Sequence, residues 1–363
     1  MRRESGTVVL QQVIKEDLPS LRVLQVGNFL SARGYTVQFV EELSDRLEQD
    51  GWHIIRASDQ VNKVSRLASI LSRIFVNRKN FDAAHITVYS GAAFVWAEAA
   101  AGMLRVLRKP VVLSLHGGNL PSFAERWPGR VSRLLNSADL VIAPSGYMRN
   151  AMLKFRKDIL LIANPVDTRL FAYRHRENVR PRLVWLRSFH ETYNPTLAAQ
   201  VLSLLVQEFP DMTLTMAGPD KGDGSFQRVK ETARELGVER NIVFTGRLDN
   251  KEVPGFLSNA DIFVNTTNVD NTPISVLEAM ACGLCVVTTN VGGIPYLLED
   301  ENEALLVERN DPASMAGAIR RILTEPDLAR RLSQHARRKA EQCDWQKVLH
   351  EWKRVFTSLH RNG

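Results

Sequence analysis

The chain alternates between short apolar runs and longer segments in which apolar residues recur every three or four positions. Short runs of this kind predict β-strands, and the recurring spacing predicts helices with one buried face. Alternation of the two predicts parallel sheets covered by helices. In the first half, the expected strands are residues 21–26, 53–55, 84–88, 111–115, 139–143 and 159–163.

The second half repeats this pattern, and 363 residues are enough for two such domains. Its expected strands are residues 183–186, 214–217, 242–244, 262–264 and 286–288. We expect a doubly wound α/β domain over residues 1–170, an Arg-rich hinge over 171–180 and a second α/β domain over 181–345. A final amphipathic helix over 346–363 is expected to pack back toward the first domain.

Composition and charge are those of a globular protein with an uneven distribution of charge. Hydrophobic residues make up 44% and charged residues 24% of the chain. Residues 1–20 lack the central apolar run of a signal peptide, and residues 91–107 are apolar but short for a membrane span. The net charge is +7, yet 23 basic and 15 acidic residues precede position 171, against 24 and 25 beyond it.

A basic first half favours a polyanionic partner, with solubility alone as the simpler explanation. An anionic membrane, a lipid diphosphate and a nucleic acid are the candidate partners. The segment 62–80 bears on this choice, because its apolar residues recur at helical spacing among basic ones. It is either a core-facing helix with a solvated basic face or a helix that lies on an anionic membrane. The apolar positions are Val64, Leu67, Ile70, Leu71, Ile74 and Phe75.

The three cysteines, Cys282, Cys285 and Cys343, do not indicate a disulfide framework. A sparse, odd set without a secretory signal favours the reducing cytosol. Cys282 and Cys285 have the spacing of a redox motif but no second pair for zinc, so we expect neither a redox nor a metal role.

The most informative motif spans residues 268–283 and continues over 286–295. It predicts a polar loop with Asp270, a helix that starts near residues 273–275 and carries Glu278, and a glycine at the helix end. Free N–H groups at such a helix start suit a phosphate. Two carboxylates eight residues apart can hold separate hydroxyls of a sugar and a ribose.

This motif resembles the Glu-x7-Glu signature of family 4 glycosyltransferases, the group 1 family of the GT-B fold. Asp270 stands where glutamate is more usual, while Glu278 and residues 292–295 (Gly-Gly-Ile-Pro) match closely. The resemblance implies two Rossmann-like domains that face each other across a cleft. The acceptor side would be the N-terminal domain, and the C-terminal domain would bind the nucleotide sugar.

Further positions fit the same family. His116 follows an expected strand and corresponds to the histidine that contacts the sugar. Arg187 corresponds to the arginine beside the donor diphosphate, but residues 188–195 lack the lysine that usually follows it. Pro273 also departs from the family, since it removes a backbone N–H where glycine is common. The resemblance therefore assigns His116, Arg187 and Asp270 to catalysis.

Several other residues are expected to bind the donor. Gly27 lies in the first strand–helix loop, which does not have the GxGxxG pattern of nicotinamide-binding proteins. Gly218 and the pair Gly246 and Arg247 end successive strands of the second domain. The signature loop and helix supply the remaining donor-binding positions, which are Asn271, Thr272, Ile274 and Glu278.

The expected function is that of a retaining glycosyltransferase that moves a hexose from a UDP- or GDP-sugar to a glycan or lipid-linked acceptor. The setting would be polysaccharide or envelope glycan synthesis, in the cytoplasm or at the inner face of the membrane. No metal, cofactor or nucleic-acid partner is expected. The alternatives are a nucleotide-sugar epimerase on the same fold and a silent sugar-nucleotide-binding scaffold, which the missing lysine and Pro273 would favour.

Overall fold

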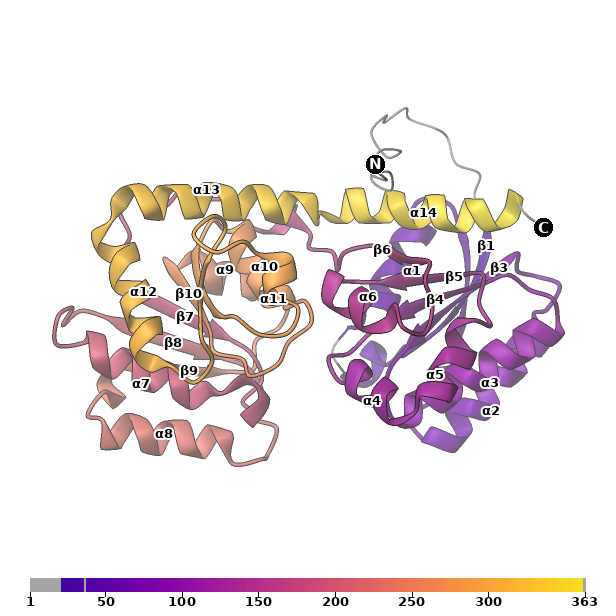
Figure 1. The fold of residues 1–363 in the computed structure, drawn as a ribbon, viewed down its shortest axis with the longest axis horizontal. Coiled ribbons are helices and arrows are strands. Elements are labelled where there is room, and N and C mark those ends of the chain that lie inside the picture. Colours follow the sequence, from indigo (N-terminus) through magenta and orange to yellow (C-terminus); the bar gives the residue numbers. More distant parts are fainter. Residues whose placement is uncertain (1–20, 36, 362–363) are drawn as a thin grey trace, which may run out of the picture.

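The computed structural model describes residues 21–35 and 37–361. The expectation about a signal peptide in residues 1–20 lies outside them. Within the described residues the chain forms two parallel six-stranded sheets, each covered by helices (Figure 1). This arrangement confirms the expected pair of α/β units.

The N-terminal sheet has the strand order β2-β1-β3-β4-β5-β6, and each neighbouring pair is parallel. Its strands are β1 (Arg22–Val26), β2 (His53–Ala57), β3 (Ala83–Val88), β4 (Val111–Leu115), β5 (Leu140–Ala143) and β6 (Ile159–Leu161). The helices of this half are α1 (Phe39–Gln49), α2 (Lys63–Val76), α3 (Ala92–Val106), α4 (Leu120–Arg126), α5 (Pro128–Leu135) and α6 (Gly146–Met152).

The C-terminal sheet has the order β12-β11-β10-β7-β8-β9, again with parallel neighbours. Its strands are β7 (Arg182–Leu186), β8 (Thr213–Ala217), β9 (Ile242–Gly246), β10 (Ile262–Asn265), β11 (Cys285–Thr289) and β12 (Leu305–Val307). Its helices are α7 (Pro195–Leu205), α8 (Ser225–Glu235), α9 (Val253–Ser258), α10 (Ile274–Ala281), α11 (Ile294–Leu297), α12 (Pro312–Thr324) and α13 (Pro326–Gln342).

A final helix, α14 (Trp345–Arg361), returns to the N-terminal half and lies nearly end to end with α13 (Figure 1). Trp352 and Phe356 are buried in one apolar cluster with Val23 of β1 and Leu43 of α1. The Trp345 indole N–H donates to Glu42 Oε2 at 3.0 Å. α14 therefore completes the core of the half from which it is most distant in sequence.

The Arg-rich connector between the halves is anchored by a buried carboxylate. Arg174 Nη2 lies 2.5 Å from Asp261 Oδ1, and Arg182 Nη2 lies 2.9 Å from Asp261 Oδ2. Arg176 is buried beside them and donates to the Cys282 carbonyl at 2.6 Å. Burial lowers the pKa of Arg176 to about 10. Arg174 and Arg176 thus fix the connector to the C-terminal half, with Arg176 buried and Arg174 still partly exposed.

In the basic amphipathic segment 62–80, some apolar side chains are buried in the core and others are exposed to solvent. Ile70 and Ile74 of α2 are buried in the N-terminal core. Val64 is 78% exposed, Phe75 52% and Val76 67%. The apolar stripe is therefore only partly a core face. None of the helices, as far as the structure describes them, combines the length and apolar composition needed to cross a membrane.

Candidate active site

A pocket of about 540 Å³ lies at the carboxyl ends of β7, β8 and β9. Open parallel α/β sheets bind ligands at this edge. Arg187, Gly218 and Arg247 line the pocket from three successive loops, and Glu278 lines it from α10. Tyr35 and Val37, of the N-terminal half, close another side, so the pocket lies between the two halves. The remaining lining residues are Leu186, Ser188, Pro219, Lys221, Leu248, Asp249, Asn250, Lys251, Val253 and Ser275.

Arg187 and Asp270, which the sequence assigns to catalysis, form an ion pair in the structure. Both side chains are largely buried, and the Arg187 guanidinium lies 4.2 Å from the centre of the Tyr193 ring. Burial raises the pKa of Asp270, while Arg187 and the Asn271 N–H partly offset that rise. The guanidinium thus offsets part of the cost of burying this carboxylate.

The loop that carries Asp270 is held by the glycine pair of the second part of the motif. Gly293 N–H donates to the Asp270 carbonyl at 2.9 Å. A Cβ at Gly293 would lie 1.7 Å from the Asn271 carbonyl oxygen, and one at Gly292 would lie 2.1 Å from that of Asp270. Only glycine allows such an approach. The Gly-Gly pair therefore sets the position of Asp270.

Glu278 is the motif carboxylate that lines the pocket. Burial, followed by the proximity of the Glu42 carboxylate, raises the pKa of Glu278 to about 7, against the opposing effect of Arg187. Glu42 belongs to α1 in the N-terminal half. Glu278 is therefore close to an even balance of its charged and neutral forms at neutral pH.

His116 lies at the end of β4, outside the main pocket. Its ring packs 5.3 Å from Phe39 and 5.4 Å from Tyr89, and it lines a second space of only about 10 Å³. The neighbouring Gly118 faces the Asp270 loop, since a Cβ there would lie 3.9 Å from Val269. His116 is thus near the junction of the halves, but it does not share the large pocket with Arg187.

A buried chain of hydrogen bonds holds His116. His85 Nδ1 lies 2.5 Å from Gln25 Oε1, His85 Nε2 lies 2.6 Å from Ser114 Oγ, and Ser114 Oγ lies 2.9 Å from His116 Nε2. Burial lowers the pKa of His85 to about 3 and that of His116 to about 4, so both rings are neutral.

An amide oxygen only accepts hydrogen bonds, so His85 Nδ1 donates to Gln25. Neutral His85 then accepts from the Ser114 hydroxyl through Nε2, and Ser114 Oγ accepts from His116 Nε2–H. The chain therefore leaves His116 Nδ1 as a hydrogen-bond acceptor. Such an atom suits a sugar hydroxyl.

The predicted donor-binding residues fall into two groups. Gly218, Arg247 and Glu278 line the pocket, and Gly246 ends β9 directly before Arg247. Gly218 is required there, because a Cβ would lie 1.7 Å from the Arg187 carbonyl oxygen.

The signature loop and the helix start are partly occupied by other contacts. The Ser145 hydroxyl, from the N-terminal half, donates to Asn271 Oδ1. Thr272 is buried, and its hydroxyl has no partner among the described residues. Ile274 is 44% exposed at the start of α10. Asn271 thus joins the two halves in this structure.

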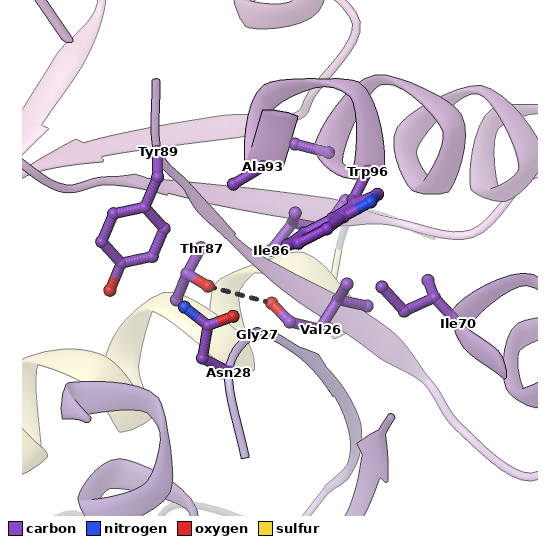
Figure 2. Close-up of a pocket in the computed structure, with 10 residues that line it drawn as sticks. Val26, Gly27, Asn28, Ile70, Ile86, Thr87, Tyr89, Ala93 and Trp96 are labelled. Carbon is purple, nitrogen blue, oxygen red and sulfur yellow. Dashed lines mark hydrogen bonds between the residues drawn. The ribbon is translucent and has the colours of Figure 1, made fainter. Parts of the chain in front are cut away.

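Gly27 lies apart from the other predicted donor residues. It lines a space of about 20 Å³ within the N-terminal half, beside Asn28 and Thr87 (Figure 2). A Cβ at Gly27 would lie 2.7 Å from Val40 Cγ1 and 2.8 Å from Thr87 Oγ1. The glycine therefore allows α1 to pack closely against the sheet, and the structure does not bring it to the large pocket.

The sequence did not indicate Lys221, Lys251, Ser275 and Tyr35 as pocket residues. Lys221 and Lys251 follow strands, Tyr35 lies in a loop of the other half and Ser275 lies at the start of α10, so the pocket that they share joins elements remote in sequence. Among the described residues there is no group of three or more His, Cys, Asp or Glu side chains that could hold a metal. Cys282, Cys285 and Cys343 are free and buried.

Two family models match the chain, one to each half. The model described as Glycosyltransferase Family 4 matches residues 20–170, and that described as Glycosyl transferases group 1 matches residues 173–339. N-acetyl-alpha-D-glucosaminyl L-malate synthase of Bacillus anthracis is 24% identical over 369 residues, which cover 93% of both chains.

Solved structures share the fold. Sucrose-phosphate synthase of Thermosynechococcus elongatus superposes with a TM-score of 0.76 at 17% identity, over 94% of this chain and 100% of the other. Anabaena HepE, solved with UDP and glucose, superposes with a TM-score of 0.71 at 17% identity, over 93% of this chain and 100% of the other.

The two parallel sheets and the pocket between the halves have the architecture of the GT-B fold. The chain belongs to the group 1, or family 4, glycosyltransferases.

Proposed function

We propose that the chain transfers a sugar from a UDP- or GDP-sugar to a hydroxyl of a glycan or glycolipid, with retention of anomeric configuration. One observation carries the proposal: Arg187, whose guanidinium pairs with Asp270, lines one pocket between the halves together with Glu278. That pocket is also lined by Lys221, Arg247 and Lys251, against the acidic side chains Asp249 and Glu278, which suits an anionic ligand.

Each of these groups has a role in this proposal. Arg187 stabilises the departing diphosphate, for which a guanidinium is well suited. Glu278 accepts hydrogen bonds from the ribose hydroxyls. Asp270 and His116 position the transferred sugar. Ser275 faces the phosphates at the start of α10, where its buried hydroxyl has no partner among the described residues.

Attack by the acceptor from the same face as the departing phosphate would give retention without a covalent intermediate. Charge neutralisation by Arg187 and the neighbouring cations makes a metal unnecessary for the donor. The name of the Bacillus anthracis relative describes transfer to a small hydroxy acid, whereas the basic N-terminal half here favours a larger or anionic acceptor in polysaccharide or envelope glycan synthesis.

Donor choice and reaction type can be tested in two stages. Thermal unfolding with UDP-, GDP- and ADP-glucose should show stabilisation by one of them, since a ligand that binds only the folded state raises the midpoint. Release of nucleoside diphosphate should then depend on an acceptor. An isomerised sugar would indicate an epimerase, and binding without any turnover would indicate a scaffold. A protein that none of the three donors stabilises would contradict the proposal.

We also propose peripheral contact of the N-terminal half with an anionic membrane at its cytoplasmic face. α2 exposes Val64, Arg73, Phe75 and Val76, and the exposed Lys79 follows three residues after the helix ends. An amphipathic helix with this pairing binds headgroups by charge and inserts apolar side chains.

Vesicle sedimentation tests this contact. Binding should require anionic lipid and weaken with salt. Replacement of Phe75 and Val76 by serine should weaken it, whereas Leu204→Ser, an exposed apolar position on α7, should not. Binding that is unchanged by salt and by the double substitution would refute the contact.

A further inference from the structure

The loop after β7 supplies too little positive charge for a diphosphate. A nucleotide-sugar diphosphate carries two negative charges near neutral pH, and the loop contains Arg187 but no lysine through residue 195. The Arg187 guanidinium is already paired with Asp270. That pair is nearly neutral overall, so at least one further cation must face the phosphates.

Three other basic side chains line the same pocket, and strand order separates them. Lys221 follows β8, the immediate neighbour of β7, whereas Arg247 and Lys251 follow β9, one strand farther out. Neighbouring strands lie about 4.8 Å apart. The strand that precedes Lys221 therefore lies one strand spacing from the strand that precedes Arg187. The strand that precedes Arg247 and Lys251 lies two spacings away.

Backbone hydrogen bonds tie Lys221 to the Arg187 loop. Arg187 N–H donates to the Ala217 carbonyl at 3.1 Å and Phe189 N–H to that of Pro219 at 2.9 Å. Lys221 N–H in turn donates to the Phe189 carbonyl at 3.2 Å. The pairing of β7 with β8 thus continues past both strands and stops at Lys221.

The Lys221 ammonium is available for a ligand. In the part of the chain that the structure describes, no ion pair involves it, and the residue is exposed at the pocket. Asp220 Oδ1 accepts from the Gly222 N–H at 2.9 Å, which holds the turn around Lys221. A fixed backbone with a free charged end suits recognition of a phosphate as a point charge.

We propose that Lys221, from the loop after β8, supplies the second cation for the donor diphosphate in place of the lysine that is absent after β7. This assignment rests on the proposed function. Because Lys221 is exposed, we take the lower end of the range for a charge-assisted hydrogen bond, which is about a tenfold gain in affinity.

Calorimetric titration with UDP, UMP and uridine tests the assignment, or with the corresponding series if GDP or ADP binds better. Lys221→Met should weaken diphosphate binding about tenfold while leaving nucleoside binding unchanged, and Lys221→Arg should recover most of the loss. Lys251→Met should weaken the diphosphate less. Lys230→Met, on α8 where the ammonium lies over the Phe226 ring, should have no effect.

The outcomes separate this assignment from the proposed function. If wild-type protein binds a diphosphate and Lys221→Met binds it with an affinity within about twofold of wild type, the role of Lys221 would be refuted. The proposed function would not be affected by that result. An equal loss for diphosphate and nucleoside would also refute this role, because it would show a general effect on the pocket. Wild-type protein that binds none of the three diphosphates would refute the proposed function and the assignment with it.

Discussion

The raised pKa of Glu278 gives a quantitative prediction for donor binding. Burial and Glu42 raise this pKa to about 7. If only the ionised carboxylate accepts the ribose hydroxyls, binding must remove the proton that the free protein carries at lower pH. Affinity should therefore increase with pH up to about 7 and then level off. The affinity at pH 6 should be about tenfold weaker than at pH 8, or about 1.4 kcal/mol.

Isothermal titration with the preferred nucleotide sugar between pH 6 and pH 8 measures this slope. The diphosphate of a nucleotide sugar is a diester without a proton to titrate in that range, whereas the terminal phosphate of UDP titrates near pH 6. Glu278→Gln should bind about tenfold more weakly than wild type at pH 8 and lose the slope. A flat wild-type profile, or a slope that persists in Glu278→Gln, would refute the reasoning.

Two further predictions concern the carboxylate loop. Arg187→Ala should lower kcat/KM about 10²- to 10³-fold and cost about 3–5 kcal/mol of unfolding free energy by leaving Asp270 buried without its partner. Protonated Asp270 needs no cation, so urea denaturation should show a smaller cost at pH 5 than at pH 8; an equal cost would contradict this account. Gly293→Ala, which places a Cβ against the Asn271 carbonyl, should cost about 1–3 kcal/mol and weaken donor binding. Gly317→Ala, in open space on α12, should not destabilise.

The periodicity of apolar residues predicted the two sheets well, because buried parallel strands and their covering helices leave strong local patterns. The apolar segment 91–107 forms α3, and the basic amphipathic segment 62–80 contains α2. Short helices such as α9 and α11 have too few turns for a recognisable period.

The Arg-rich connector has contacts that the sequence alone could not show. Arg174 and Arg176 pair with Asp261, which is remote in sequence. The composition of a segment shows that it is charged, but it does not show which distant residues neutralise that charge.

The family resemblance assigned Arg187, Asp270 and Glu278 to one site, and in the structure Arg187 pairs with Asp270 and lines a pocket with Glu278. It could not predict Lys221, whose place depends on how β7 and β8 pair beyond their ends. Gly27 was expected at the donor site on its loop position alone, and the close packing against Val40 that explains this glycine is a tertiary contact.

The return of α14 to the N-terminal half has a consequence for biosynthesis. Residues 21–161 emerge from the ribosome before the C-terminal half, yet one face of their sheet is covered by Trp352 and Phe356, which are translated after that half. The earlier half must wait with apolar surface open to solvent or to a chaperone while some two hundred further residues are added. The N-terminal core can therefore close only after α14 has been synthesised, and translational pausing before Trp345 would prolong its vulnerability to aggregation.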